Sequence, residues 1–424
     1  MRARAFWGCC PAILWLSAQA ASAMDLGTNF WNLKWHKPSD CFNDVNNVTG
    51  ENPWNPQFLK EIAIYRSFRF MDWDNTNHST RKNWSERTRK GDPKQTPVAY
   101  EWMIDLCNRM DGDMWVCIPH PTVNRDTGDK PSDYVLRLCI LVRTGVDMKT
   151  VDLAPLEEKC GAMTADDFVK AGGEKTTEPL KENLKLYIEY SNETWNGMFK
   201  QSHYCVEEGT ALKLDPKGKP GNDGKIWGNG FRFHAWAAVR LFRAADLIFG
   251  AGSPRIVKVL ATQSGQASIC AQHQQVLADA KLNPWGVKAT AIAAAPYFGR
   301  GVDGSDAEVL AKLREAMQKS ISGSEKLKAF ADQAGLKLIA YEGGQHVINM
   351  AKKINQSPAM HDLYVEYLTE MAKYYSHFCH YAHVGRAGDR GCWGCIEYTG
   401  QPIEEAHKYR ALSEWSARHP RSGG

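Results

Sequence analysis

Two glutamates stand at the ends of apolar segments that have the composition of buried strands. Glu193 follows the strand-forming run 184–190, and Glu342 closes a second such run at 336–342. A parallel strand buried on both faces stays apolar up to its C-terminal tip, and in a closed α/β barrel that tip borders the reactive cleft. One carboxyl group of such a pair can donate a proton while the other, ionised, attacks an electrophilic carbon.

Cleavage of a glycosidic bond with retention of configuration uses such a pair, with the two groups ~5 to 5.5 Å apart. Glu193 and Glu342 are the pair expected to carry out this chemistry. Glu189 is the rival on the first strand, but it lies four residues earlier, about 13 Å deeper at ~3.3 Å per residue. For either glutamate alone, a helix-capping or salt-bridged structural role stays open.

Two further side chains have the chemistry that a nucleophile needs. Arg69 lies near the end of the alternating segment 66–73, and Tyr297 ends the segment 289–297. A cation and a hydroxyl donor would keep Glu342 ionised. Asn192 precedes Glu193, where it would hydrogen-bond a sugar 2-hydroxyl or cap the strand end.

These residues require elements that bring distant strand ends together. Eight segments have strand patterns, and most are followed by a helical pattern. Alternation of this kind over ~250 to 400 residues predicts a single (β/α)8 TIM barrel. A doubly wound open sheet is disfavoured because no glycine-rich phosphate fingerprint follows the first strand. The expected strands are 26–33, 66–73, 114–119, 184–190, 255–262, 289–297, 336–342 and 378–384.

Two long insertions interrupt the alternation. The segment 147–183 has no sustained period and reads as a connection with one short helix. The segment 197–229 contains a proline- and glycine-rich loop signature. The Ser322-Gly323 pair predicts a break in the helix expected at 307–334. The remaining expected helices are 58–64, 97–110, 133–146, 231–249, 266–280, 361–375 and 404–415.

In barrel order, these residues resemble the pattern of glycoside hydrolase clan A, the (β/α)8 retaining glycosidases, over most of the chain. Asn192-Glu193 is similar to the clan's substrate ligand and acid/base, and Glu342 in Tyr-Glu-Gly-Gly to its nucleophile. The resemblance implies that Arg69 and Tyr297 hold that nucleophile and that Trp393 forms the floor of the sugar site. The chain departs from familiar members in its insertions and in the Gly-Gly-Gln-His that follows Glu342.

Other candidate cleft residues are less distinctive. Trp195 and Trp393 are the aromatic side chains expected to stack on sugar rings, with further candidates at Trp31, Trp35, Trp73 and Trp227. His120 and His346 sit at strand ends and either line the cleft as substrate-binding residues or are structural. Together with Asp72 they offer a zinc alternative, which no His-Glu-x-x-His or comparable spacing supports, so no metal or other cofactor is expected.

The N-terminus has the pattern of a secretory signal peptide. Arg2 and Arg4 precede the apolar run 5–16, and Ala-Ser-Ala at 21–23 offers a cleavage site. Residues 1–23 are therefore expected to be removed and 24–424 to form one catalytic domain, secreted to the extracellular space or the periplasm. Removing Cys9 and Cys10 leaves 10 of the 12 cysteines, an even number that permits disulfides in a secreted chain.

The net charge of +4, from 52 basic and 48 acidic residues, is close to balance, and the basic residues form no stripe that would bind nucleic acid. No later apolar run is long enough to span a membrane. The sequence thus predicts a secreted retaining glycoside hydrolase that cleaves a β-linked polysaccharide or oligosaccharide. The alternatives are a non-catalytic carbohydrate-binding barrel and a transglycosylase that uses the same residues.

Overall fold

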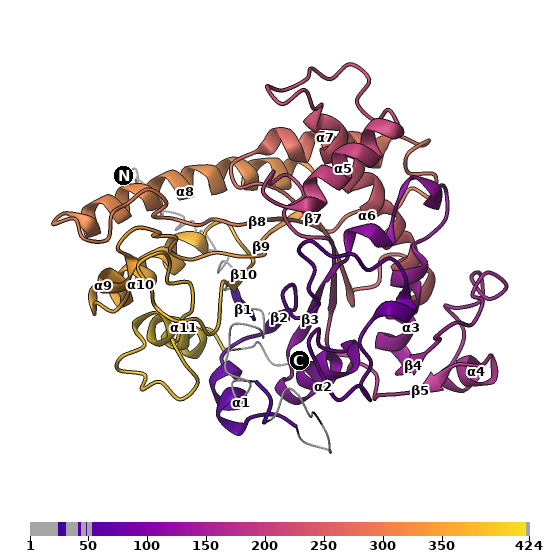
Figure 1. The fold of residues 1–424 in the computed structure, drawn as a ribbon, viewed down its shortest axis with the longest axis horizontal. Helices are drawn as coiled ribbons and strands as arrows, with labels where there is room; N and C mark the ends of the chain where they lie inside the picture. Colours follow the sequence, from indigo (N-terminus) through magenta and orange to yellow (C-terminus); the bar gives the residue numbers. More distant parts are fainter. Residues whose placement is uncertain (1–23, 31–40, 44–47, 49–52, 421–424) are drawn as a thin grey trace, which may run out of the picture.

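The computed structural model describes residues 24–30, 41–43, 48 and 53–420, so the expected signal peptide, Trp31 and Trp35 lie outside the described residues. Eight parallel strands close into one barrel in the order β1-β10-β9-β8-β7-β6-β3-β2 (Figure 1). Each expected strand overlaps one of them, which confirms the barrel, although β1, β3 and β10 each begin one residue earlier than expected. The strands are β1 Asp25–Asn29, β2 Ser67–Arg69, β3 Asp113–Ile118, β6 Leu186–Tyr190, β7 Ile256–Ala261, β8 Ala291–Ala294, β9 Lys337–Ala340 and β10 His377–His380.

The strands bury both faces because alternate residues point to two different layers. On β3, Trp115 and Cys117 point into the barrel, whereas Met114 and Val116 pack outward under the helices. The outer cluster is the larger one and joins the strands to the helical layer. Inside the barrel, polar groups accompany the apolar ones near the C-terminal strand ends, where the site lies.

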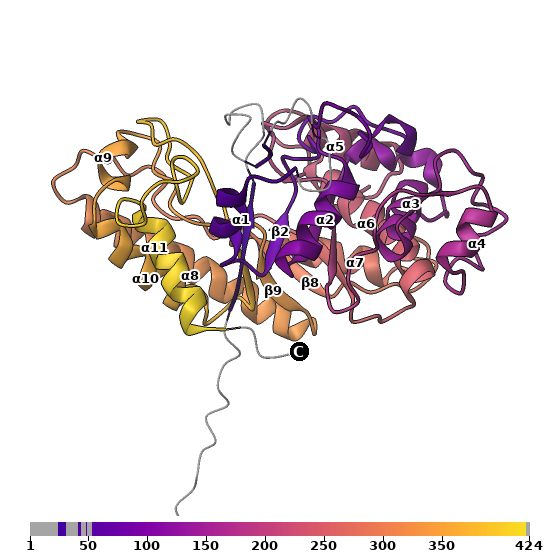
Figure 2. The same ribbon diagram turned by 90° about the horizontal axis from the view of Figure 1, so that it is seen from below.

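Helices surround the barrel in two groups (Figure 2). The C-terminal helices α8, α10 and α11 gather on one side of the strands, and the helices between β2 and β8 cover the other. The long helices are α2 Tyr100–Met110, α3 Asp133–Thr144, α5 Lys200–Ala211, α6 Trp227–Phe249, α7 Ala267–Ala278, α8 Val309–Gln333, α10 Ala359–Met371 and α11 His407–Arg418. The shorter ones are α1 Pro56–Ile62, α4 Ala165–Lys170 and α9 Ala351–Asn355.

The expected break at Ser322-Gly323 is wrong, because α8 is continuous from Val309 to Gln333. A single glycine in a helix interior costs about 1 kcal/mol, which the burial of neighbouring apolar residues outweighs. The buried Ser324 also bonds within the helix, donating from Oγ to the carbonyl of Ser320 at 2.9 Å.

The insertion 147–183 holds more structure than one short helix. Strand β4, Val146–Asp147, pairs antiparallel with β5, Glu174–Lys175, and α4 lies between them in the chain. Asp147 is fully buried and accepts hydrogen bonds from Arg87 and from the Trp84 indole, which tie this small sheet to the barrel. In the other insertion, 197–229, helix α5 precedes the glycine-rich loop.

The ten cysteines of the described residues are all buried free thiols, so the structure does not support the expected disulfides. Free cysteines in cores commonly pack as small apolar side chains, and some of these thiols also donate hydrogen bonds, as Cys395 does to the carbonyl of His383 at 2.9 Å. Within the part of the chain that the structure describes, no helix has the length and apolar character needed to cross a bilayer.

Candidate active site

Glu193 lies three residues beyond β6, in a turn that points its side chain across the barrel mouth. Ser191 and Glu193 both have positive φ, 56° and 44°, a left-handed conformation that is uncommon for residues other than glycine and often marks functional turns. The half-buried carboxylate accepts hydrogen bonds from the Tyr341 hydroxyl at 3.1 Å and from Asn196 Nδ2 at 2.8 Å. Thr194 then bonds to the buried His234 ring at 2.9 Å, which anchors the turn.

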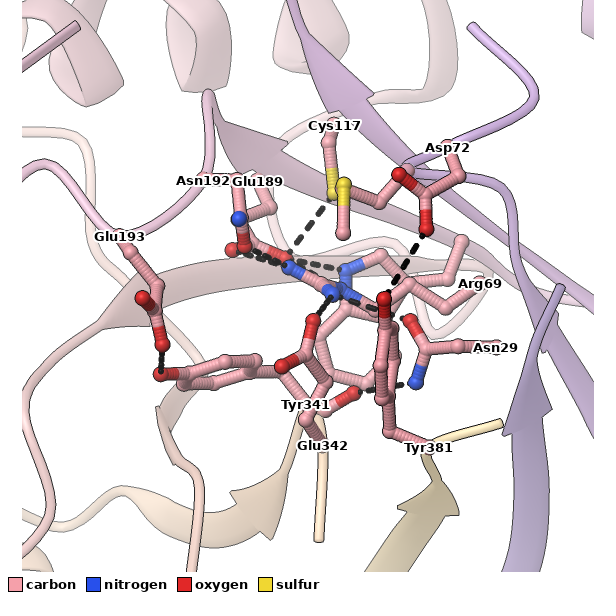
Figure 3. Close-up of polar contacts among 12 residues, drawn as sticks. Asn29, Arg69, Asp72, Cys117, Glu189, Asn192, Glu193, Tyr341, Glu342 and Tyr381 are labelled. Carbon is pink, nitrogen blue, oxygen red and sulfur yellow. Dashed lines mark hydrogen bonds and ion pairs between the residues drawn. The ribbon is translucent and has the colours of Figure 1, made fainter. Parts of the chain in front are cut away.

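Glu342 follows β9, and the close-up shows it on the same side of Arg69 as Tyr341, whose hydroxyl bonds to Glu193 (Figure 3). Its Oε1 accepts from Arg69 Nη1 at 2.9 Å, and its Oε2 accepts from the Tyr297 hydroxyl at 2.9 Å. The preceding residue, Tyr341, bonds through its hydroxyl to Glu193. The segment 341–342 therefore contacts one glutamate of the pair and contains the other. The structure therefore brings together the two expected carboxylates and the two expected partners of Glu342.

The electrostatics of Glu342 differ from the expectation that Arg69 and Tyr297 keep it ionised. Burial raises the pKa of Glu342 to about 8, and the nearby Glu193 and Asp72 charges act in the same direction, while Arg69 and Tyr297 lower it. Loss of hydration on burial is the largest effect, and Arg69, which also pairs with Glu189, offsets only part of it.

All five N–H groups of Arg69 have partners, and its side chain is fully buried. Nε and one N–H of Nη2 bond to the two oxygens of Glu189, each at 2.9 Å. The other N–H of Nη2 goes to Asn192 Oδ1 at 2.9 Å, and Nη1 goes to Asn29 Oδ1 at 3.0 Å and to Glu342 at 2.9 Å. The depth of Glu189 along its strand argued against a role at the site. The Arg69 guanidinium nevertheless bonds to both Glu189 and Glu342, the expected nucleophile.

Asn192 is placed beside the pair but is already engaged. Its Oδ1 accepts from Arg69, and its Nδ2 donates to Asn77 Oδ1 at 3.1 Å. The backbone carbonyl of Asn192 also accepts from Gln201 Nε2 at 2.8 Å. These contacts fix the orientation of the amide next to Glu193.

Trp195, Trp393 and His346 surround this centre. The Trp195 ring lies 6.0 Å from the Tyr341 ring, on the side of Glu193. The Trp393 indole donates to His346 Nδ1 at 3.2 Å, and the His346 ring meets Tyr297 edge-on at 5.1 Å. All three expected cleft residues are half-buried, so each keeps some surface toward solvent.

His120 and Trp73 lie elsewhere. Only 4% of His120 is exposed, its ring packs against Tyr204 at 4.9 Å, and burial lowers its pKa to about 4. Trp73 is in the aromatic core, stacked on Phe30 at 4.7 Å. Nothing in these contacts links either side chain to Glu193 or Glu342. Among the described residues, no group of three His, Cys, Asp or Glu side chains is arranged to hold a metal ion, and this includes the set of His120, His346 and Asp72.

Asp72 was identified from the sequence only as a possible zinc ligand, and Asn29 and Tyr381 were not identified as site residues. Asp72 faces the Tyr381 hydroxyl at 3.4 Å, and burial raises the pKa of Asp72 to about 7, against the lowering effects of Arg69 and Tyr381. Asn29 is the last residue of β1 and binds Arg69 and the carbonyl of Tyr341. The available signal was polar side chains at the ends of β1, β2 and β10, the positions from which Glu193 and Glu342 were found.

The raised pKa of Glu342 predicts that Glu342→Gln stabilises the protein at alkaline pH. Because the folded pKa of about 8 exceeds the ordinary value near 4.5, the stability that this group contributes is complete below pH ~4.5 and is lost as pH rises through 8. We expect Glu342→Gln and the wild type to unfold alike near pH 4.5, and the variant to be more stable by roughly 1 to 4 kcal/mol at pH 9. Urea unfolding at several pH values measures this gap, and a gap that does not change with pH would contradict the prediction.

No family model matches the chain, and no curated protein matches its sequence. Solved structures do share its fold. The alpha-L-arabinofuranosidase from Thermotoga maritima, in an arabinose complex, has a TM-score of 0.50 at 12% identity, over 93% of this chain and 70% of that one.

A family 51 alpha-L-arabinofuranosidase from Bifidobacterium longum has a TM-score of 0.50 at 12% identity, over 94% of this chain and 74% of that one. The GH51 arabinofuranosidase from Xanthomonas axonopodis pv. citri has a TM-score of 0.50 at 9% identity, over 93% of this chain and 72% of that one. At such identities the similarity establishes the architecture alone. The chain is a single closed (β/α)8 barrel of the kind on which these arabinofuranosidases are built.

Proposed function

We propose that this protein is a retaining glycosidase, with Glu342 as nucleophile and Glu193 as acid/base, acting on a β-linked polysaccharide or oligosaccharide outside the cytoplasm. The observation that carries the proposal is that the two glutamates follow β6 and β9 of one barrel and lie close enough for the charge of Glu193 to raise the pKa of Glu342. Tyr341 bonds to Glu193, while Arg69 and Tyr297 hold the two oxygens of Glu342. The fold shared with glycosidases and the expected leader at 1–23 are consistent with it.

The first chemical step divides between the two carboxyl groups. Ionised Glu342 attacks the anomeric carbon, the bond from that carbon to the leaving oxygen breaks, and Glu193 gives its proton to that oxygen. The product is a glycosyl ester on Glu342. Arg69 and Tyr297 fix the orientation of the attacking carboxylate before the substrate arrives, so little reorganisation is needed during the step.

The second step reverses these roles. Formation of the ester removes the negative charge from Glu342, and Glu193, which has given up its proton in the first step, is available as the base. Glu193 then takes a proton from water, the water oxygen attacks the anomeric carbon, and Glu342 leaves as a carboxylate. Two inversions return the original anomeric configuration.

The ionisation of Glu342 predicts an alkaline rise in activity. Because the nucleophile must be ionised and burial raises its pKa to about 8, kcat/KM on a 2,4-dinitrophenyl glycoside, whose leaving group needs no proton from Glu193, should increase with pH through about 8. We expect roughly a tenfold rise from pH 7 to pH 9, measured under first-order conditions at constant ionic strength, with protein stability checked at each pH. A plateau already reached at pH 6 would show that Glu342 ionises more readily than its surroundings indicate.

The test of the function is a panel of 4-nitrophenyl glycosides followed by polysaccharides, scored by the mass of the products. The β-D-glucoside, β-D-xyloside, β-D-mannoside and β-D-galactoside test the β-linkage, and the α-L-arabinofuranoside tests the activity named for the structural neighbours. Hydrolysis that disappears in Glu342→Ala supports the proposal. Saturable glycan binding without product would favour a non-catalytic barrel, and sugar transfer to an added acceptor in preference to water would favour a transglycosylase.

A further inference from the structure

We propose that Glu189 is a positioning residue, which clamps Arg69 so that the arginine presents one N–H to Glu342 and another to Asn192. The catalytic consequence rests on the function proposed above, whereas the clamp itself can be tested without it. Glu189 belongs to β6, one residue before the strand ends, and its side chain is fully buried inside the barrel.

Four donor groups bond to the carboxylate of Glu189. Arg69 supplies Nε and Nη2, each at 2.9 Å, and the Trp115 indole donates to Oε2 at 2.8 Å. The Cys117 thiol adds a bond at 3.3 Å (Figure 3). Both donors from β3 approach from inside the barrel, so the carboxylate cannot rotate without losing several bonds at once.

The geometry of the guanidinium turns this anchor into an alignment device. A bidentate carboxylate fixes the plane of the five N–H groups, because the fork is rigid. With two of them held by Glu189, the directions of the other three are determined. They end on Asn192, Asn29 and Glu342.

The positive charge of Arg69 is also shared between two carboxylates. One buried cation lies between two carboxylates, Glu189 and Glu342, with 0% and 8% of their side chains exposed. A cation paired only with Glu342 would favour its ionised form more strongly than a shared one does. Glu189 therefore sets both the orientation of the expected nucleophile and the pH at which it ionises.

The stability of the fold alone does not explain this arrangement. A buried ion pair contributes little net stability, because desolvation of both groups offsets their attraction. The chain provides a matched comparison in Arg87, which bridges Glu101 through two bonds of 2.8 Å and Asp147 through one of 2.7 Å, remote from the two glutamates. That buried cluster has the same chemistry and ties the 147–183 insertion to the barrel.

The experiment follows the ionisation of Glu342 through protein stability. The pH-dependent difference in unfolding free energy between wild type and Glu342→Gln gives the ionisation midpoint of Glu342, and the same pair is measured in a Glu189→Gln background. We expect the midpoint to fall by about one pH unit or more when Glu189 is neutralised. Glu101→Gln is the control, which should lower stability and leave the midpoint in place.

Activity supplies the second readout. On the 2,4-dinitrophenyl form of the glycoside that the panel identifies, Glu189→Gln should shift the rising limb of kcat/KM to lower pH by the same amount and lower kcat by roughly 10- to 100-fold through misalignment. Should Glu189→Gln not fold, Glu189→Asp keeps the charge but shortens the reach, and it should lower kcat while moving the limb less.

The outcomes distinguish the positioning role of Glu189 from the proposed glycosidase activity. A midpoint and a limb that stay in place in Glu189→Gln, as they do in Glu101→Gln, or a kcat that Glu189→Asp leaves unchanged, overturn the role of Glu189, even if hydrolysis requires Glu193 and Glu342. A midpoint that moves supports the clamp, even if no glycoside on the panel is hydrolysed. In that case it is the proposed function that fails.

Discussion

Glu342→Ala is expected to lower kcat by about 10⁴-fold or more on the best aryl glycoside of the panel, because the attacking carboxylate is lost. The shortened side chain leaves space below the anomeric carbon, which sodium azide can occupy. Added azide should restore turnover and give a glycosyl azide of inverted configuration, since only one displacement then occurs. The measurement combines the rate of aryl release with the product anomer determined by NMR.

A matched control is Glu315→Ala, which removes a glutamate that is exposed on α8. Its activity should equal that of the wild type. Full activity in Glu342→Ala would contradict the assignment of the nucleophile. An azide product of retained configuration would also contradict it, because that outcome requires a second nucleophile in the protein.

Glu193→Ala is expected to show an effect that depends on the leaving group. A natural saccharide leaves poorly without a proton, so hydrolysis of an unactivated oligosaccharide should fall by roughly 10²- to 10⁴-fold. A 2,4-dinitrophenyl glycoside needs no proton, so its first step should proceed and the glycosyl-enzyme should accumulate, with a burst of dinitrophenol. Azide should accelerate this variant and give a product of retained configuration.

The opposite azide stereochemistry in the two variants separates the two roles. Tyr341→Phe is the graded control, because it removes the hydroxyl that bonds to Glu193 while keeping the ring beside Arg69. A loss of about tenfold, confined to poor leaving groups, is expected there. Equal losses on all leaving groups in Glu193→Ala would show that Glu193 is not the acid.

The sequence was informative where one strong pattern determined the structure. Eight buried strands separated by helices allow few arrangements other than a barrel, and the ends of parallel strands in a barrel meet at one mouth. That is why Glu193, Glu342, Arg69 and Tyr297, far apart in the chain, were placed together correctly. Their chemical roles are the proposals stated above.

Side-chain partners could not be read in the same way. The depth of Glu189 along its strand argued against a link to the site, but a long arginine side chain spans that depth. The sign of the pKa shift at Glu342 depends on the balance between desolvation and a shared cation, which requires coordinates. A buried glutamate inside a strand was nevertheless a signal, because such a charge needs a partner.

Other differences have local causes. Cysteine number permitted disulfides, but pairing depends on the distances between Cα atoms, and the described cysteines are free. His120 ends a strand as Glu193 and Glu342 do, yet its ring turns against Tyr204. A position at a strand end therefore identifies candidates, and the direction of the side chain selects among them.

The most direct test of the central claim is to trap the sugar on the protein. The enzyme is incubated with the 2-deoxy-2-fluoro, 2,4-dinitrophenyl derivative of the glycoside that it hydrolyses best, then digested and sequenced by mass spectrometry. The account predicts one fluorosugar per protein molecule, attached to the peptide that contains Glu342 and located on that residue. A label on any other residue, Glu193 included, would contradict it.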